Sequence, residues 1–353
     1  MRVGFDATSL THQGKGVARF QREFLQAADE YALIEELDVF VPPEPDEEAL
    51  PQRSSWRYHR VRNAPMVVWE QIRRPALARR LGLDAVISAS ERAALWGPPE
   101  IVYVFEHPKH RTRRSREVGI SPRQRLVDAS TLALFAIARR RATVVAASQA
   151  TARDIGADAV VYSGVSTEFT PGTGDRTFFL HLASDDPRDN SEVVIDAYAA
   201  YGRGAPPLIV AGPIRNRLAA LRERAQHAGV AVEWRGFQQG KKLVDLYRGA
   251  IAYVDPSLYE GFGLQAAEAL ACGTPVISSN RMSLPEVVGD AGILLEPNDV
   301  EGFAHAMRKV AEDTTFAAAL SRDALVQASR FTWEATVKGL LDACADALAR
   351  RRE

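Results

Sequence analysis

Short apolar runs alternate with longer amphipathic segments along the first half of the chain. The runs that predict strands there are residues 2–7, 38–42, 84–88, 101–105, 143–146 and 159–162. The segments that predict helices are residues 17–28, 68–80, 124–140 and 149–155. Such alternation is typical of a parallel, doubly wound sheet covered by helices. We therefore predict an α/β domain in this half.

The same alternation restarts after a stretch rich in turn-forming residues at 163–174. The predicted strands are residues 177–182, 207–211, 230–234, 250–254, 274–278 and 293–295. The predicted helices are residues 191–201, 215–228, 241–248, 264–271, 300–313, 315–329 and 333–351. The 353 residues suffice for two domains that each bury a core. We expect Rossmann-like domains at residues 1–170 and 171–331, followed by a C-terminal helix within residues 332–353.

A polar loop with Gly14 and Gly16 follows the first predicted strand and precedes the first predicted helix. A strand, a glycine loop and a helix at the N-terminus open many nucleotide-binding α/β domains. Glycines also serve as plain turn residues, so a single Gly-x-Gly leaves both interpretations open.

The second half contains a unit of strand, glycine turn, helix and strand at residues 250–278. The turn is Glu260-Gly261-Phe262-Gly263, and the helix begins at Leu264. The unpaired amides at residues 261–264, together with the positive end of the helix dipole, suit a phosphate group. If the sheet is parallel, this turn opens on the same edge as four other loops that follow strands.

Two carboxylates bracket this helix, Glu260 before its first turn and Glu268 eight positions later. Glu260 would be repelled by phosphate oxygens, so it is better suited to accept hydrogen bonds from sugar hydroxyls beside the phosphate. The helix around Glu268 is apolar and predicted to be buried, and a buried carboxylate needs a partner. In the alternative interpretation, Glu260 only complements the helix dipole and Glu268 faces solvent.

The Glu-x7-Glu element within EGFGLQAAEALACGTPVI, followed by SLPEVVGDAG, resembles the signature of the family 4 glycosyltransferases. The resemblance implies the GT-B fold, in which two Rossmann-like domains face a cleft and the last helix, here beginning at Trp333, returns to the first domain. It also implies transfer of a sugar, with retention of configuration, from a nucleoside-diphosphate sugar such as a UDP- or GDP-sugar to a hydroxyl acceptor. The products of such enzymes are glycans, glycolipids or glycosylated metabolites.

The resemblance also assigns roles to single residues. Glu260 and His107 are expected to contact the donor sugar. At the position of His107 the family usually has the pair His-Asp, and this chain has His107-Pro108. Glu268 is expected at the ribose hydroxyls. The other residues expected to bind the donor are Gly14, Gly16, Arg188, Gly236, Phe237, Gly261, Phe262, Gly263 and Leu264. For Gly236 and Phe237, a turn glycine and a packed aromatic side chain are the alternative interpretation.

The loop at residues 183–190 departs from the family pattern. Ser184 or Ala183 occupies the position of the usual arginine, and Asp189 occupies that of the usual lysine. These cations hold the donor diphosphate in the family, and their loss removes several charge-assisted hydrogen bonds. The cations that could substitute from neighbouring loops are Arg188, Arg215, Arg217 and Lys241. The departure motivates an alternative function, a non-catalytic accessory protein that binds sugar nucleotides.

The overall composition narrows the choice of partners. The net charge of −1 gives no reason to expect nucleic acid. The two cysteines argue against a disulfide framework, and we expect a reducing cytoplasm. No motif indicates a metal site. We therefore expect the protein to use a nucleoside-diphosphate sugar as co-substrate and to need no cofactor.

Residues 109–125 carry seven Lys or Arg against a single acid, Glu117. This run is either a solvated loop or a patch for an anionic, lipid-linked acceptor or for the inner face of a membrane. In the second case, neutralising Arg111, Arg113, Arg114 and Arg116 together should weaken association with anionic vesicles.

Overall fold

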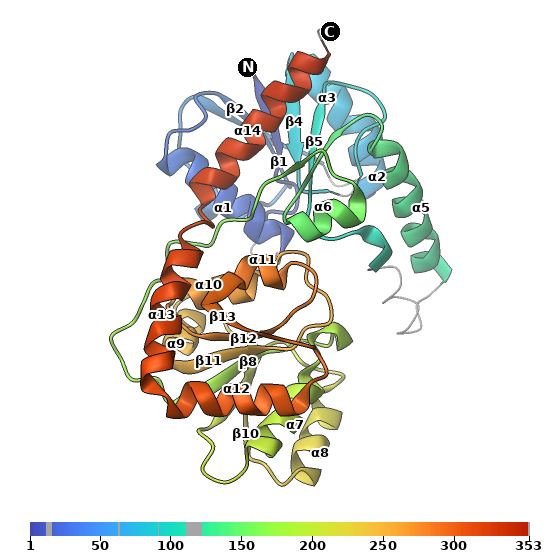
Figure 1. The fold of residues 1–353 in the computed structure, drawn as a ribbon. Coiled ribbons are helices and arrows are strands. Elements are labelled where there is room, and N and C mark those ends of the chain that lie inside the picture. The colour runs from blue at the N-terminus through green and yellow to red at the C-terminus, as the bar shows by residue number, and fades with distance from the viewer. Residues whose placement is uncertain (12–15, 63, 91, 111–121, 352–353) are drawn as a thin grey trace. The chain divides into compact units, whose positions relative to one another are not determined.

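The computed structural model describes residues 1–11, 16–62, 64–90, 92–110 and 122–351 (Figure 1). The chain divides into two compact units. Unit 1 consists of Met1–Gly164 together with Trp333–Glu353, and unit 2 consists of Val165–Thr332. None of the described helices is both long and apolar enough to cross a bilayer.

Unit 1 is built on a parallel sheet with the strand order β3-β2-β1-β4-β5-β6-β7. Its strands are β1 (Val3–Asp6), β2 (Leu37–Val41), β3 (Trp56–Arg60), β4 (Ala85–Ser88), β5 (Glu100–Val104), β6 (Thr143–Ala146) and β7 (Ala159–Val160). The sequence did not predict β3. This strand lies at the edge of the sheet, and four of its five residues are polar or half-exposed, so it lacks the apolar signal of the inner strands.

Helices cover the sheet of unit 1. They are α1 (Val17–Glu30), the 3₁₀ turn η1 (Glu47–Ala49), α2 (Met66–Val68), the π-helical turn η2 (Trp69–Arg73), α3 (Arg74–Arg80), α5 (Pro122–Ala138), α6 (Gln149–Ile155) and α14 (Trp333–Arg350). The C-terminal α14 packs against α1 and against β4, β5 and β6, which confirms the predicted return of the last helix to the first domain. The ring of Trp333 lies 5.5 Å from that of Phe20.

Unit 2 contains a second parallel sheet with the order β10-β9-β8-β11-β12-β13. Its strands are β8 (Phe178–Leu182), β9 (Leu208–Ala211), β10 (Val232–Arg235), β11 (Ala250–Asp255), β12 (Val276–Ser279) and β13 (Gly292–Leu295). Its helices are η3 (Pro187–Asp189), α7 (Ser191–Tyr201), α8 (Leu218–His227), α9 (Lys241–Gly249), α10 (Leu264–Ala271), α11 (Leu284–Val288), η4 (Gly289–Ala291), α12 (Val300–Glu312) and α13 (Thr314–Ala328). The predicted Rossmann-like architecture is confirmed in both units.

The inner strands of unit 2 are mostly buried, with Phe179, Val210 and Val254 all at 1% exposure or less. These side chains form one core with α7 and α12. Because the six strands are parallel, their carboxyl ends share one edge of the sheet. The loops that follow β8 to β12 therefore meet at that edge, as predicted.

Candidate active site

The glycine turn before α10 lies at the carboxyl end of β11. Gly263 is the N-cap residue of α10 and has a φ of 87°, a conformation that residues with a side chain rarely adopt. A Cβ on this glycine would also lie 3.0 Å from Leu284 Cδ2. Ser283 Oγ donates a 2.8 Å hydrogen bond to the carbonyl of Glu260. The hydrogen bond from Ser283, the N-cap residue of α11, thus holds the turn in place. The backbone amides of the turn lie at the N-terminus of α10, a helix of eight residues.

The predicted residues Glu260, Gly261, Gly263 and Leu264 lie together in this turn, and Glu260 is partly exposed. The ring of Phe262 is 5% exposed and packs edge-on against Phe331. The backbone of Phe262 can therefore bind a ligand, while its side chain is part of the core.

Glu268 is buried in α10, with 1% exposure. The hydroxyl of Tyr247 in α9 donates a 3.0 Å hydrogen bond to its Oε2 atom. The interpretation in which Glu268 faces solvent is therefore wrong. A buried carboxylate needs a hydrogen-bond donor, and Tyr247 supplies one. The predicted role of Glu268 at a ribose stays a prediction.

The loop after β8 is held by Asp189, the residue at the position of the family's lysine. Its Oδ2 accepts hydrogen bonds from Ser184 at 2.5 Å from the backbone N–H and at 2.7 Å from Oγ. Burial raises the pKa of Asp189, although the Ser184 hydrogen bonds oppose this shift. Both residues that replace the usual cations therefore bond to each other and shape the loop.

Three of the four candidate substitute cations pair with carboxylates, and two of these, Arg188 and Arg217, lie in the loops after β8 and β9. Arg188 places Nε and Nη2 at 3.1 and 2.8 Å from Asp186 Oδ2, and its guanidinium lies over the ring of Tyr259. Arg217 pairs with Glu192 and donates a 2.8 Å hydrogen bond to the carbonyl of Asp186. Arg188 lies at the predicted edge, but its charge is balanced within its own loop.

The other two candidates differ from each other. Lys241 forms an i,i+4 pair with Asp245 on the surface of α9. Arg215 is exposed, and within the described part of the chain no carboxylate forms an ion pair with its guanidinium. Asp185 Oδ1 accepts the backbone N–H groups of Arg215 and Arg217, and these bonds lower the pKa of the Asp185 carboxyl. The loop that carries Arg215 is thereby tied to the loop after β8.

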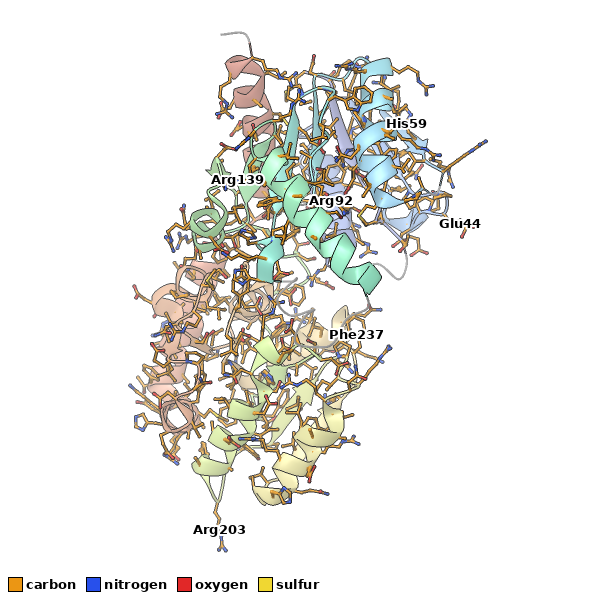
Figure 2. The ribbon with its side chains drawn as sticks, turned by 90° about the vertical axis from the view of Figure 1, so that its right-hand side faces the viewer. Glu44, His59, Arg92, Arg139, Arg203 and Phe237 are labelled. Carbon is orange, nitrogen blue, oxygen red and sulfur yellow. The ribbon has the colours of Figure 1, made fainter. Side chains whose placement is uncertain are left out.

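The loop after β10 presents an aromatic ring at the same edge. Phe237 is 53% exposed (labelled in Figure 2), so it is not a packed core side chain. The carbonyl of Gly236 accepts a 3.2 Å hydrogen bond from the N–H of Gly212. Gly212 has a φ of 134°, and a Cβ there would lie 1.9 Å from the carbonyl oxygen of Ala183. The sequence did not single out Gly212, because its requirement arises from a long-range approach of two loops.

The remaining predicted residues belong to unit 1. His107 follows β5, and its Nδ1 accepts the N–H of Lys109 at 3.0 Å. Burial lowers the pKa of His107, with Lys109 as a further cause, so the neutral ring carries its proton on Nε2. Gly16 is the N-cap of α1, with a φ of 46°. Gly14 and the part of the basic run at residues 111–121 lie outside the described residues.

Comparison with known proteins gives a family match for part of the chain. Residues 168–330 match the model of the glycosyl transferases group 1 family. O-antigen chain mannosyltransferase B of Escherichia coli is 38% identical over 164 residues, which are 44% of this chain and 42% of that protein. D-inositol 3-phosphate glycosyltransferase of Acidothermus cellulolyticus is 38% identical over 219 residues, 55% of this chain and 49% of that protein. The chain thus spans about half the length of these relatives or less.

The fold has close counterparts among solved structures. Sucrose-phosphate synthase from Thermosynechococcus elongatus superposes with a TM-score of 0.76 at 18% identity, covering 99% of this chain and 100% of that one. Anabaena HepE, solved with UDP and glucose, gives a TM-score of 0.69 at 17% identity and covers 99% of each chain. Residues 168–330 thus match the group 1 glycosyltransferases, and the chain as a whole has the GT-B fold.

Proposed function

We propose that the protein transfers a sugar from a nucleoside-diphosphate sugar to a hydroxyl acceptor, with retention of configuration. The observation that carries this proposal is the turn Glu260–Gly263, which is fixed by Ser283 and opens the N-terminus of α10. Donor diphosphate oxygens accept hydrogen bonds from the amides of residues 261–264. As the bond to the sugar breaks, negative charge grows on the diphosphate, and the same amides and the helix dipole stabilise it.

The sugar and the ribose then lie on either side of the diphosphate. Glu260 accepts hydrogen bonds from hydroxyls of the donor sugar. Glu268 accepts from the ribose while keeping its bond to Tyr247, since a carboxylate has two acceptor oxygens. Phe237 and the backbone of Gly236 receive the nucleobase, because the exposed ring offers a stacking face.

His107 and Gly16 lie in unit 1, and the proposal keeps for them the roles that the family resemblance implies. His107 is neutral, and its Nε2–H donates a hydrogen bond to a hydroxyl of the donor sugar. Gly16, the N-cap of α1, keeps its proposed role near the phosphates or the acceptor. No side chain is assigned as a nucleophile, and the acceptor attacks the face from which the diphosphate leaves, with a diphosphate oxygen taking its proton.

The relatives suggest which substrates to test first. Their names describe a mannosyltransferase acting on an O-antigen chain and a glycosyltransferase acting on D-inositol 3-phosphate. We therefore propose a hexose donor, with GDP-mannose and UDP-glucose as first candidates, and a sugar or polyol hydroxyl as acceptor. The buried free thiols Cys272 and Cys344 support a reducing cytoplasm as the site of action.

Replacement of Glu260 tests the proposed site. We expect Glu260→Gln to lower turnover of the best donor by roughly tenfold or more, because the neutral amide binds the sugar hydroxyls less strongly in the transition state. Circular dichroism and the urea midpoint should not change. Glu301→Gln, an exposed carboxylate on α12, is the matched control and should keep normal turnover.

Two results would count against this assignment. Normal turnover in Glu260→Gln would remove this residue from the site. Tight donor binding by calorimetry, without turnover by the unmodified chain across a broad acceptor set, would favour the accessory binding protein instead.

A further inference from the structure

Helix α10 carries two polar side chains, Gln265 and Glu268, and a tyrosine hydroxyl holds each of them. The two residues are three positions apart, so they lie on the same face of the helix. Tyr247 of α9 donates to Glu268 at 3.0 Å, and Tyr253 of β11 donates to Gln265 at 2.9 Å. The two tyrosine rings pack edge-on against each other, with their centroids 5.7 Å apart. Both side chains are thus oriented by residues of α9 and β11, which pack against α10 (Figure 1).

The bond from Tyr253 determines which end of the Gln265 side-chain amide is available to a ligand. Tyr253 is completely buried, and burial raises the pKa of its hydroxyl well above the ordinary value, with Asp255 as the next cause. The hydroxyl therefore stays protonated and donates to Gln265 Oε1, which leaves two N–H donors on Nε2. Gln265 is exposed, and within the described part of the chain no other residue bonds to its side-chain amide. Nε2 can therefore donate to a bound anion.

The proposed contacts of the donor follow α10 in the order of the groups in a nucleotide sugar. Glu268 is assigned to the ribose, and residues 261–264 with Glu260 are assigned to the diphosphate and the sugar. Gln265 lies between these two places, about 4.5 Å nearer the helix start than Glu268. Side chains of an α-helix lean toward its N-terminus, and this carries the Gln265 amide toward the diphosphate.

Gln265 also lies near the position of the missing cations. The charges of Glu260 and Asp189 are further causes of the raised pKa of Tyr253. The Tyr253 hydroxyl, and the Gln265 amide bonded to it, therefore lie near both the glycine turn and the loop after β8. A diphosphate there needs hydrogen-bond donors from elsewhere, because neither Ser184 nor Asp189 supplies a cation.

We propose that Gln265 binds the donor diphosphate, with its Nε2–H groups donating to a nonbridging phosphate oxygen. Tyr253 is the positioning residue that holds the amide in this orientation. The Gln265 donor thereby replaces one of the bonds that cations make in the family. This inference rests on the proposed sugar transfer, and it adds a side-chain contact to the backbone contacts of the glycine turn.

Calorimetry of the full chain with GDP and with UDP tests the proposal. Gln265→Met keeps the length of the side chain and removes its donors, so we expect the affinity for the tighter nucleotide to fall roughly tenfold. Gln265→Glu keeps an acceptor for Tyr253 but sets a negative charge against the phosphates, and it should lower the affinity by roughly a hundredfold. Gln226→Met, at an exposed position of α8, is the matched control and should bind normally.

A double-variant cycle separates nucleotide binding from a purely structural role. Tyr253→Phe frees the Gln265 amide, so it should lower nucleotide affinity about threefold in the unmodified chain and leave it unchanged in Gln265→Met. Equal losses in the two backgrounds would overturn the positioning role of Tyr253. Normal nucleotide affinity in Gln265→Met would overturn the inference and leave the proposed reaction standing. If the unmodified chain binds neither nucleotide, the proposed reaction fails, and this inference fails with it.

Discussion

Glu268 and Asp189 are buried carboxylates that find their hydrogen-bond partners in different places. Asp189 takes both donors from Ser184, five positions away, while Glu268 takes the hydroxyl of Tyr247 from a neighbouring helix. The sequence predicted that Glu268 would be buried and would need a partner. It could not name Tyr247, because the packing of α9 against α10 is set by the whole sheet.

Removal of the Tyr247 hydroxyl should therefore destabilise unit 2. Tyr247→Phe leaves a buried carboxylate oxygen without its donor, and we expect a loss of about 1–3 kcal/mol in the free energy of unfolding. Tyr253→Phe is the matched control, because its hydroxyl bonds to the exposed side chain of Gln265 and should cost less, about 1 kcal/mol. Urea unfolding measures the loss of stability in both variants. Equal losses would contradict the larger cost that we expect when the buried Glu268 carboxylate loses its donor.

His107 should titrate below the ordinary histidine range. Burial and Lys109 lower its pKa from 6.5, so the neutral ring stabilises the fold above pH 6.5, and this contribution is lost as the pH falls through the folded-state pKa. NMR of the labelled imidazole should show the Nε2–H tautomer at neutral pH. A neutral ring with its proton on Nδ1 would remove the donor role proposed for Nε2, and a pKa at or above 6.5 would contradict the effect of burial and Lys109.

The sequence also could not predict the ion-pair partners of the cations at the sheet edge of unit 2. The sequence offered Arg188, Arg215, Arg217 and Lys241 as possible substitutes for the family's cations, with Arg188 as the expected donor-binding residue. The structure pairs three of them with acids and leaves Arg215 exposed. Ion pairing depends on which loops become neighbours at the sheet edge, and local sequence carries little information on this.

Elements were predicted more completely than side-chain partners. The strong apolar periods of the inner strands and of helices such as α7 and α10 placed these elements within a few residues of their bounds. The polar edge strand β3 and the five-residue α11 were missed, because neither carries a full apolar period. The π-helical hydrogen bonding of η2 also has no signal in the residue pattern.

The close approach of the loops after β8 and β9 gives a test at this scale. Gly212→Ala would place a Cβ against the carbonyl of Ala183 and keep an unfavourable φ, so we expect a loss of about 3 kcal/mol or more in unfolding free energy. Gly229→Ala, with a φ of 69° and no atom within 4 Å of the added Cβ, should cost about 1 kcal/mol. If thermal or urea unfolding shows similar losses of stability for Gly212→Ala and Gly229→Ala, the loops after β8 and β9 can separate freely.

For the whole molecule, the alternation of strands and helices sufficed to predict two parallel α/β units, and the resemblance to the family 4 glycosyltransferases implied the return of the last helix to unit 1. The chain leaves unit 1 after Gly164 and re-enters it at Trp333. The glycine turn before α10 was predicted because its signal is local: a strand, glycines and a helix start within fifteen residues. The proposed sugar transfer depends on donor binding at that turn.

A crystal structure of the full chain with GDP-mannose or UDP-glucose tests this claim most directly. We expect diphosphate oxygens about 2.7–3.2 Å from backbone nitrogens of residues 261–264, with sugar hydroxyls at the Glu260 carboxylate. A donor whose diphosphate lies away from the start of α10, or a donor that leaves these amides in contact with solvent, would contradict it.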